Sequence, residues 1–228
     1  MLNRQGADQW LPASLVAVPV LCACGWLAST SEPGWWLPFA VVTVAWLAFL
    51  AFFRDPPRTP AAGSEGCMLS PADGRVSAVI EQAHHECVGG PATVVRIYLS
   101  VLDVHVNRVP WNGEVVRRAH SPGQYLDVRL AESARVNESL LLSMRAPEGF
   151  PWGVRLVAGA VARRIACTAR AGGIVSRGDR MGLIKFGSTT ELVVPGGWQT
   201  LVRVGDRVTG GVTILATLGA PGSGRSVA

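Results

Sequence analysis

The chain has 228 residues, a formal net charge of +5 and only 16% charged residues against 49% hydrophobic ones. Soluble domains carry about 25% charged residues, so this deficit points to a membrane-associated protein. All basic residues except Lys185 are arginines, and they are scattered without long runs, which argues against a nucleic-acid-binding arm. The five cysteines show no spacing typical of a zinc site, so no metal site is expected.

Two apolar segments open the chain, at residues 9–31 and 33–53, and Glu32 is the single charge between them. A helix needs roughly 20 apolar residues to cross a bilayer. The segments therefore predict an N-terminal transmembrane helical hairpin over residues 1–53, with helices at about 11–30 and 35–53.

Charges at the ends of this hairpin predict its orientation. Arg4 precedes the pair and Arg54 and Arg58 follow it, whereas the connecting loop has no lysine or arginine. The positive-inside rule then places both ends, and everything after them, on the cytoplasmic side of the cell membrane. Two alternatives stay open: the first segment as a cleaved signal peptide, and a hairpin that lies in the interface.

Residues 54–66 form a connector in which Pro56, Pro57 and Pro60 prevent a continued helix. From 67 to 228 the chain changes to short apolar or alternating runs punctuated by glycine, which predicts a mostly β domain with few helices. The runs interpreted as strands are RVSAVIEQ, ATVVRIYLSV, GEVVRRAH, SLLLSMR, GVRLVAGAVARRIAC, GGIVSRG, MGLIKF, TELVVP and VTILATL. The stretch PGQYLDVRLAESARVNES is expected to be irregular or helical.

An internal repeat supports the β assignment. Residues 171–184 and 204–217 superpose at a spacing of 33 residues, so that Gly172 falls on Gly205. Such hairpins resemble the halves of a barrel-sandwich, the architecture of lipoyl and biotinyl carriers. A carrier needs an exposed lysine at a hairpin tip, and Lys185 does not occupy one, which disfavours that function.

Three polar patches carry the residues that could do chemistry. SPADGRV contains Asp73, YLSVLDVHVNRVP contains His105, and FGST places Ser188 directly after Gly187. Each alone has an ordinary explanation as a turn or a buried core residue. Together they supply a carboxylate, an imidazole and a hydroxyl, the components of a triad that activates a nucleophile.

Five motifs occur in a fixed order: FFRDPPR, SPADGRV, YLSVLDVHVNRVP, GAVARRIAC and FGST. In this order they resemble the phosphatidylserine decarboxylases, specifically the short membrane-anchored branch that includes archaetidylserine decarboxylases. The resemblance covers about residues 50–218. It implies a carboxy-lyase that converts phosphatidylserine to phosphatidylethanolamine and CO2 through a Schiff base with a covalent pyruvoyl group.

The residues agree with such a cofactor. Decarboxylation of an α-amino acid needs an electron sink, and pyridoxal phosphate is one that requires a Schiff-base lysine. Lys185 is the sole candidate for that lysine. A pyruvoyl group needs none, because its own ketone forms the imine with the substrate amine.

The family makes its pyruvoyl group from the serine of a Gly-Ser pair. By that match Ser188 attacks the carbonyl of Gly187, the resulting ester eliminates, and the dehydroalanine left at position 188 hydrolyses to pyruvate. The products are a β chain of residues 1–187 and an α chain of residues 188–228, which form a heterodimer. The family also allows a homo-oligomer. Gly187 suits the cut because glycine tolerates a strained turn and has no side chain to block attack.

The same match assigns roles to the other polar residues. His105 takes the proton of Ser188 and later protonates the substrate carbon, and Asp73 orients His105. Some family members have a second histidine where this chain has Arg108, so both roles fall here on His105. Arg108, His120 and Thr189 are candidates for binding the substrate.

Three alternatives remain open. The first is an archaetidylserine decarboxylase, which differs only in the lipid tails of its substrate. The second is a non-catalytic membrane-anchored adaptor with a barrel-sandwich domain, for which the chain stays intact. The third is a hydrolase that uses Ser188 uncleaved, although the chain lacks the GxSxG elbow of one such class.

Overall fold

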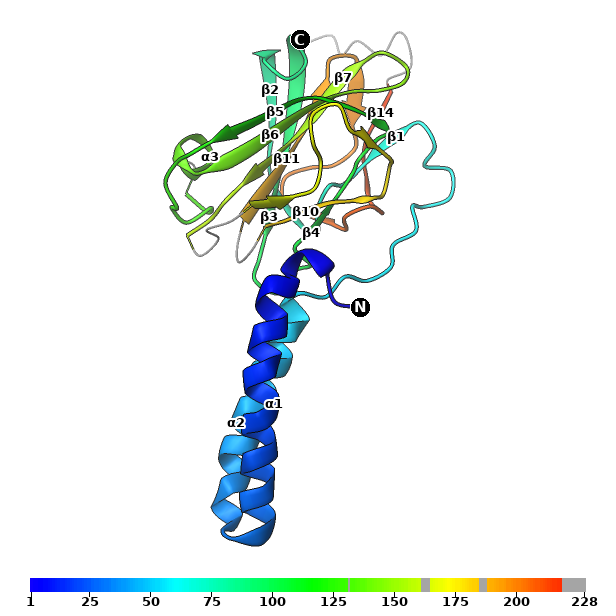
Figure 1. Cartoon of the computed structure of the whole chain (residues 1–228). Helices are drawn as coiled ribbons and strands as arrows, with labels where there is room; N and C mark the ends of the chain where they lie inside the picture. Colours follow the sequence, from blue (N-terminus) through cyan, green and yellow to red (C-terminus); the bar gives the residue numbers. More distant parts are fainter. Residues whose placement is uncertain (131, 161–164, 185–187, 219–228) are drawn as a thin grey trace. The chain divides into compact units, whose positions relative to one another are not determined.

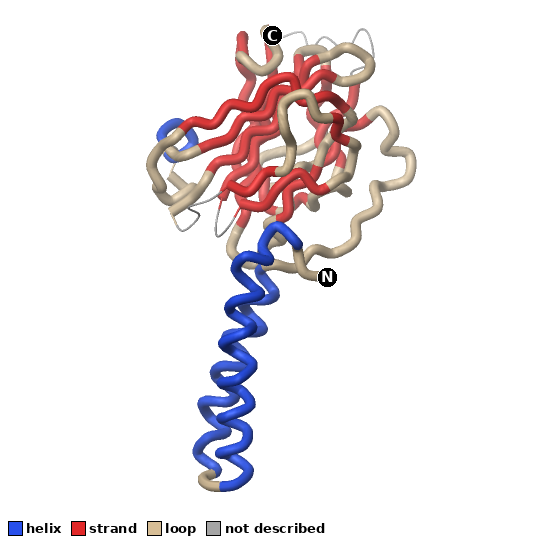
Figure 2. Tube along the Cα trace, viewed as in Figure 1, coloured by secondary structure: helices blue, strands red, loops and turns tan. Residues whose placement is uncertain are grey.

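The computed structural model describes residues 1–130, 132–160, 165–184 and 188–218. The chain divides into two compact units, Met1–Pro56 and Pro57–Ala228. The first unit is helical and the second is built mainly of strands, as the colours of Figure 2 show.

The first unit is a pair of helices that lie side by side (Figure 1). Its elements are η1 (Arg4–Gly6), α1 (Ala7–Thr30), η2 (Pro33–Trp35) and α2 (Trp36–Phe52). Helix α1 begins four residues before the expected boundary, and Asp8 in its first turn favours that start, since a negative charge stabilises a helix N-terminus. Both helices are long and apolar enough to cross a membrane.

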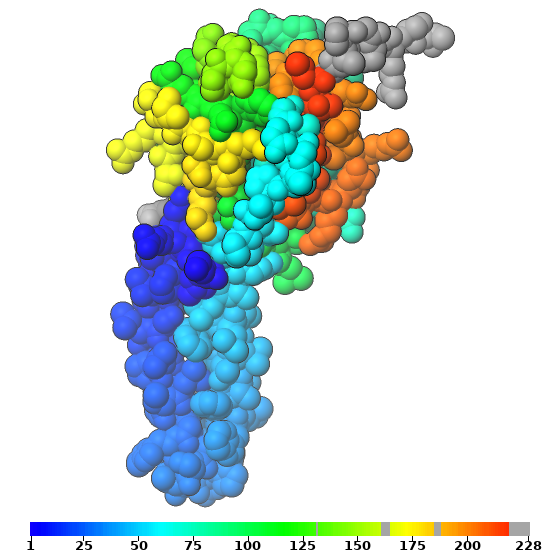
Figure 3. Space-filling model, turned by 90° about the vertical axis from the view of Figure 1, so that its right-hand side faces the viewer, coloured from blue at the N-terminus to red at the C-terminus, as the bar shows by residue number. Residues whose placement is uncertain are grey.

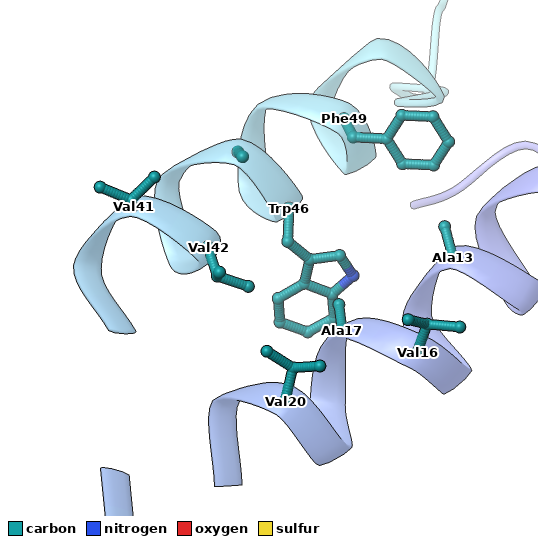
Figure 4. Close-up of a pocket in the computed structure, with 9 residues that line it drawn as sticks. Ala13, Val16, Ala17, Val20, Val41, Val42, Trp46 and Phe49 are labelled. Carbon is teal, nitrogen blue, oxygen red and sulfur yellow. The ribbon is translucent and has the colours of Figure 1, made fainter. Parts of the chain in front are cut away.

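An apolar groove runs between α1 and α2. Its volume is about 440 Å³, and it is lined by Ala13, Val16, Ala17, Val20, Val41, Val42, Ala45, Trp46 and Phe49. Figure 4 shows the Trp46 ring reaching from α2 towards α1, where its Nε1 donates to Ser14 Oγ at 3.1 Å. Because the lining side chains include no acid, base or nucleophile, the groove is unsuited to catalysis.

The second unit confirms the prediction of a mostly β fold. Within the described residues its strands are β1 (Cys67–Leu69), β2 (Gly74–His85), β3 (Gly90–Leu99), β4 (Val106–Arg108), β5 (Gly113–Ser121), β6 (Ser139–Arg145), β7 (Pro151–Val157), β8 (Ile165–Cys167), β9 (Ile174–Val175), β10 (Arg180–Ile184), β11 (Ser188–Pro195), β12 (Trp198–Thr200), β13 (Arg207–Val208) and β14 (Ile214–Leu218). The stretch expected to be irregular contains one short helix, α3 (Ser133–Val136).

The largest sheet is antiparallel and has the order β13-β2-β3-β11-β7-β6-β5-β9. Two small sheets, β1-β14-β12 and β4-β10-β8, complete the unit. Strand β11 lies in the middle of the large sheet and is buried along its whole length. Its run of apolar residues fits that position, because a strand covered on both faces does not need polar alternation.

The main core lies on one face of this sheet and includes Trp152, Leu142, Leu156, Ile97 and Leu192, each fully buried. Burying a side chain of this size contributes roughly 1.5–3 kcal/mol. A smaller apolar cluster around Cys87 and Val193 covers part of the second face.

The internal repeat is visible as two similar strand pairs, β9–β10 and β13–β14. The four glycines that the repeat superposes all have positive φ: 78° at Gly172, 97° at Gly205, 88° at Gly178 and 72° at Gly211. Other residues rarely adopt this conformation, which explains why glycine recurs at each turn.

Residues 54–66 are expected as a connector. Those from 57 to 66 are packed along one face of the β unit, where the cyan atoms of Figure 3 lie between yellow and orange ones. Arg177 Nη2 donates to the carbonyl oxygen of Ser64 at 2.6 Å and to its Oγ at 2.8 Å. Arg58 forms an ion pair with Asp73 at 2.8 Å. The prolines prevent a helix here, and these contacts fix the extended chain on the surface.

Candidate active site

Ser188 is the first residue of β11 and pairs with Leu99 of β3. Its side chain is fully buried, and its Oγ makes no hydrogen bond among the residues that the structure describes. Buried hydroxyls in folded proteins nearly always have a partner, so an exception requires an explanation. Gly187, the expected cleavage partner, and Lys185 lie outside the described residues.

His105 precedes β4 and is also fully buried. Its Nδ1 lies 2.9 Å from the carbonyl oxygen of Asp103. A carbonyl oxygen can only accept, so Nδ1 carries the proton of the neutral ring and Nε2 carries the lone pair. This tautomer leaves Nε2 able to act as a base.

Asp73 lies in the turn before β2, and its carboxylate accepts hydrogen bonds from Arg58 and Gly210. Arg58 Nη2 donates to Oδ2 and the Gly210 N–H donates to Oδ1, both at 2.8 Å. A Cβ at position 210 would lie 3.2 Å from Oδ1, so glycine lets the backbone come this close.

Backbone register brings the segments of Asp73 and Ser188 to the same end of the large sheet. Arg75 pairs with Tyr98, and Tyr98 pairs with Thr189. Asp73 is two residues before Arg75, and Ser188 is one residue before Thr189. The two segments are therefore separated by a single strand, β3.

Strand β4 connects the His105 segment to the segments of Asp73 and Ser188 through hydrogen bonds. Thr190 Oγ1 donates to Asn107 Oδ1 at 2.7 Å, and both side chains are fully buried. The Arg108 N–H donates to the Pro71 carbonyl at 2.8 Å. Because residues two apart in a strand share a face, Ser188 points to the same side of β11 as Thr190, the side that contacts Asn107.

The three candidates for substrate binding have different surroundings. Arg108 is nearly buried, and its Nη1 donates to the Gly178 carbonyl at 3.1 Å. Thr189 is buried on the face of β11 opposite to Ser188, and its Oγ1 has no partner within the described part of the chain. His120 is on β5, with β7 and β6 between it and β11, a separation of about 14 Å at the usual strand spacing.

His120 belongs to a small polar cluster near β5, away from β11. Its Nε2 lies 3.0 Å from Glu138 Oε1, and the Tyr125 hydroxyl donates to Glu138 Oε2. Partial burial alone would raise the pKa of Glu138, but the hydrogen bonds from Tyr125 and His120 outweigh it and lower this pKa below its usual value. The cluster joins β5 to the loop between β5 and β6.

Comparison with known proteins decides the family. The model of the phosphatidylserine decarboxylase family matches residues 46–216. The chain belongs to the phosphatidylserine decarboxylase family. Similar proteins of this family are named phosphatidylserine decarboxylase proenzyme. One from Pelobacter propionicus is 41% identical over 207 residues and 91% of each chain, and one from Salinibacter ruber is 41% identical over 194 residues, 84% of this chain and 86% of its own. A third, from Aromatoleum aromaticum, is 37% identical over 96% of each chain.

Two features of this phosphatidylserine decarboxylase family member were not predicted from its sequence. One is the side-chain hydrogen bond between Thr190 and Asn107, and the other is the ion pair between Arg58 and Asp73. Arg58 belongs to the motif FFRDPPR, and its pairing with a later aspartate has no local signature. Asn107 gives a weak signal, as an amide between Val106 and Arg108 in a short strand.

Proposed function

We propose that this chain is a self-processing phosphatidylserine decarboxylase whose catalytic group is made from Ser188. The observation that carries the proposal is the fully buried Ser188 Oγ, which has no hydrogen-bond partner among the described residues. Leaving a buried hydroxyl unpaired costs free energy, so its position is better explained by chemistry than by stability. The family and the word proenzyme in the names of its members support the same conclusion.

Processing begins when His105 Nε2 takes the proton of Ser188 Oγ, which attacks the carbonyl carbon of Gly187. The Gly187–Ser188 C–N bond breaks as an ester forms, and the nitrogen of residue 188 gains a proton. Loss of the Cα proton of residue 188 then expels the Gly187 carboxylate and leaves dehydroalanine. Water hydrolyses it, ammonia leaves, and a pyruvoyl group remains at the start of the α chain.

Asp103 and Asp73 assist His105 in different ways. The backbone carbonyl of Asp103 accepts from Nδ1 and so sets the tautomer that acts as a base. The carboxylate of Asp73, held by Arg58 and Gly210, supplies negative charge that stabilises the imidazolium formed when His105 takes a proton.

The buried position of Ser188 fits a pyruvoyl group, which is smaller than serine plus a peptide bond and has no N–H to satisfy. Once formed, this group supplies the electron sink for loss of CO2 from the bound serine headgroup. His105, in its protonated form, then donates a proton to the carbon that CO2 has left. Burial of these residues limits the access of water to the reaction.

The apolar helices α1 and α2 fit the role of a membrane anchor for such an enzyme. A serine headgroup on a lipid lies at the bilayer surface, and an enzyme held there meets its substrate without extracting it. We place the β unit on the cytoplasmic side because Arg4, Arg54 and Arg58 flank the hairpin.

Activity on lipid in a bilayer tests this proposal. The wild type and Ser188→Ala are reconstituted in nanodiscs containing phosphatidylserine, and the ethanolamine lipid and CO2 are measured. We expect equal amounts of both products from the wild type and none from the variant. A wild type that forms neither product contradicts the proposal, and activity confined to ether-linked archaetidylserine identifies the sister enzyme instead.

A further inference from the structure

Two large apolar side chains are exposed next to each other in the turn that joins β3 to β4. Val101 is 57% exposed and Leu102 is 83% exposed. Single exposed apolar residues are common on protein surfaces. An adjacent apolar pair at the centre of a tight turn is uncommon, because such positions favour Gly, Pro, Asn, Asp and Ser.

The turn is held rigidly by Asp103. Its N–H donates to the Ser100 carbonyl at 3.0 Å, and its Oδ2 accepts from the Ser100 N–H at 2.8 Å and from Ser100 Oγ at 2.7 Å. The side chain of Asp103 is nearly buried. Val101 and Leu102 are therefore held outward by a fixed backbone, and their exposure is a property of the turn.

The turn is directly connected to the candidate active site. It starts after Leu99, which pairs with Ser188, and Asp103 at its end accepts the hydrogen bond from His105. In Figure 1 this connection lies at the end of the sheet where β3 and β4 are labelled. A surface that contacts Val101 and Leu102 is thus within a few residues of both reacting groups.

Basic side chains accompany the apolar pair. Arg207 Nη2 donates to Asp103 Oδ1 at 2.8 Å, and its side chain is 68% exposed. Arg207 pairs across the strands with Arg75, which is also exposed. Because Asp103 and the exposed Asp206 reduce the local positive charge, the attraction to an anionic surface is modest and the apolar pair contributes most.

We propose that Val101 and Leu102 insert into the interfacial layer of the bilayer and hold the active site at the level of the lipid headgroups. An apolar tip with adjacent arginines is the pattern of a segment that lies in a membrane interface. The inference rests on the proposed function for its substrate. It adds a second membrane contact, separate from the helical hairpin and next to the reacting groups.

The test uses full-length enzyme in nanodiscs and two forms of phosphatidylserine, long-chain lipid in the bilayer and short-chain lipid dissolved as monomers. The variant is Val101→Ser with Leu102→Ser, and the control is Ile174→Ser. Ile174 is 77% exposed and lies on β9, at the edge of the large sheet opposite to β13. The amount of self-cleaved chain reports folding, because processing is internal to the protein.

We expect the double variant to process normally, to lose about tenfold or more in rate on dilute bilayer lipid, and to act on the monomeric lipid within about twofold of the wild type. Burial of one such side chain is worth at least a tenfold change in a partition equilibrium. Leu102→Trp, which keeps an apolar tip, should retain the bilayer rate, and Ile174→Ser should behave as the wild type.

Equal losses on both forms of the lipid would show that the turn shapes the active site and would overturn the proposal. Unchanged rates on both forms would overturn it as well. A wild type that is inactive on both forms would instead refute the proposed function. If the turn bound a protein partner instead of the bilayer, the double variant would lose no rate on bilayer lipid, because the nanodiscs contain no such partner.

Discussion

Among single residues, the site combines a buried Ser188 hydroxyl that has no partner within the described residues and a His105 imidazole whose Nδ1 is engaged. Ser188 Oγ lacks a partner among the described residues, whereas His105 Nδ1 is bound to the Asp103 carbonyl. A histidine held in this way presents its other nitrogen as a base without needing a carboxylate to choose the tautomer. The role of Asp73 in orienting His105 stays a prediction, and the negative charge of Asp73 is the contribution proposed above.

Removal of the base or of this charge should stop self-cleavage. We expect His105→Ala and Asp73→Ala to accumulate the uncleaved chain, measured by the ratio of proenzyme to α chain after synthesis in a cell-free system. His84→Ala, in an exposed position of the β2–β3 hairpin, is the control and should process as the wild type does. Rapid complete processing of either variant would remove that residue from the mechanism.

The bond between Thr190 and Asn107 should matter both for stability and for processing. Thr190→Val leaves the buried amide oxygen of Asn107 without its donor, at a cost of about 1–3 kcal/mol in the free energy of unfolding. Processing should also slow, because Asn107 holds the segment of His105.

Denaturant unfolding measures the first effect of Thr190→Val, and the time course of cleavage measures the second. Thr189→Val is the matched stability control, since the Thr189 hydroxyl has no partner in the described part of the chain. Equal destabilisation by the two substitutions would show that the bond between strands has no special role.

At the scale of elements, β11 holds polar groups on both faces of an otherwise apolar strand. Ser188 and Thr190 face the His105 segment, and Glu191 on the other face is bound by Arg96 at 2.7 Å and by Arg155 at 3.4 Å. These ion pairs join β11 to both of its neighbours, β3 and β7. They position the strand whose first residue is Ser188.

Glu191→Gln should destabilise the fold by about 3–5 kcal/mol, because it leaves two partly buried guanidinium groups facing each other without an anion. Denaturant unfolding of the Ser188→Ala background measures the effect on a single intact chain. The control is Glu86→Gln, whose partner Arg117 is well exposed, and its cost should stay below about 1 kcal/mol. Similar costs at the two positions would contradict the structural role given to Glu191.

The sequence predicts the long strands well, because apolar alternation and flanking glycines are local signals. The short strands β1, β12 and β13 are not predicted, since three or two residues carry too little pattern and depend on their pairing partners. The run GVRLVAGAVARRIAC appears as one strand in the sequence, whereas β7 ends at Val157. Residues 161–164 of that run lie outside the described residues.

At the scale of the whole molecule, membership of the phosphatidylserine decarboxylase family and the two-unit division of the chain are consistent with an anchored lipid enzyme. The motifs that indicate the family are contiguous in sequence and can be recognised without a structure. The contacts that bring them together are not local: β3 separates Asp73 from Ser188, and Asn107 meets Thr190 from 83 residues away. Only the fold reveals these relationships.

Self-processing at Ser188 is tested most directly by the intact mass of the purified wild type beside that of Ser188→Ala. Self-processing predicts two chains from the wild type, residues 1–187 and 188–228, with the smaller lighter by one ammonia than a chain that begins with serine. It also predicts that this α chain resists amine-reactive reagents, because it contains no lysine and has lost its terminal amine. Ser188→Ala should give one unbroken chain. A single intact chain in both samples, or an α chain that begins with an ordinary serine, would contradict the central claim.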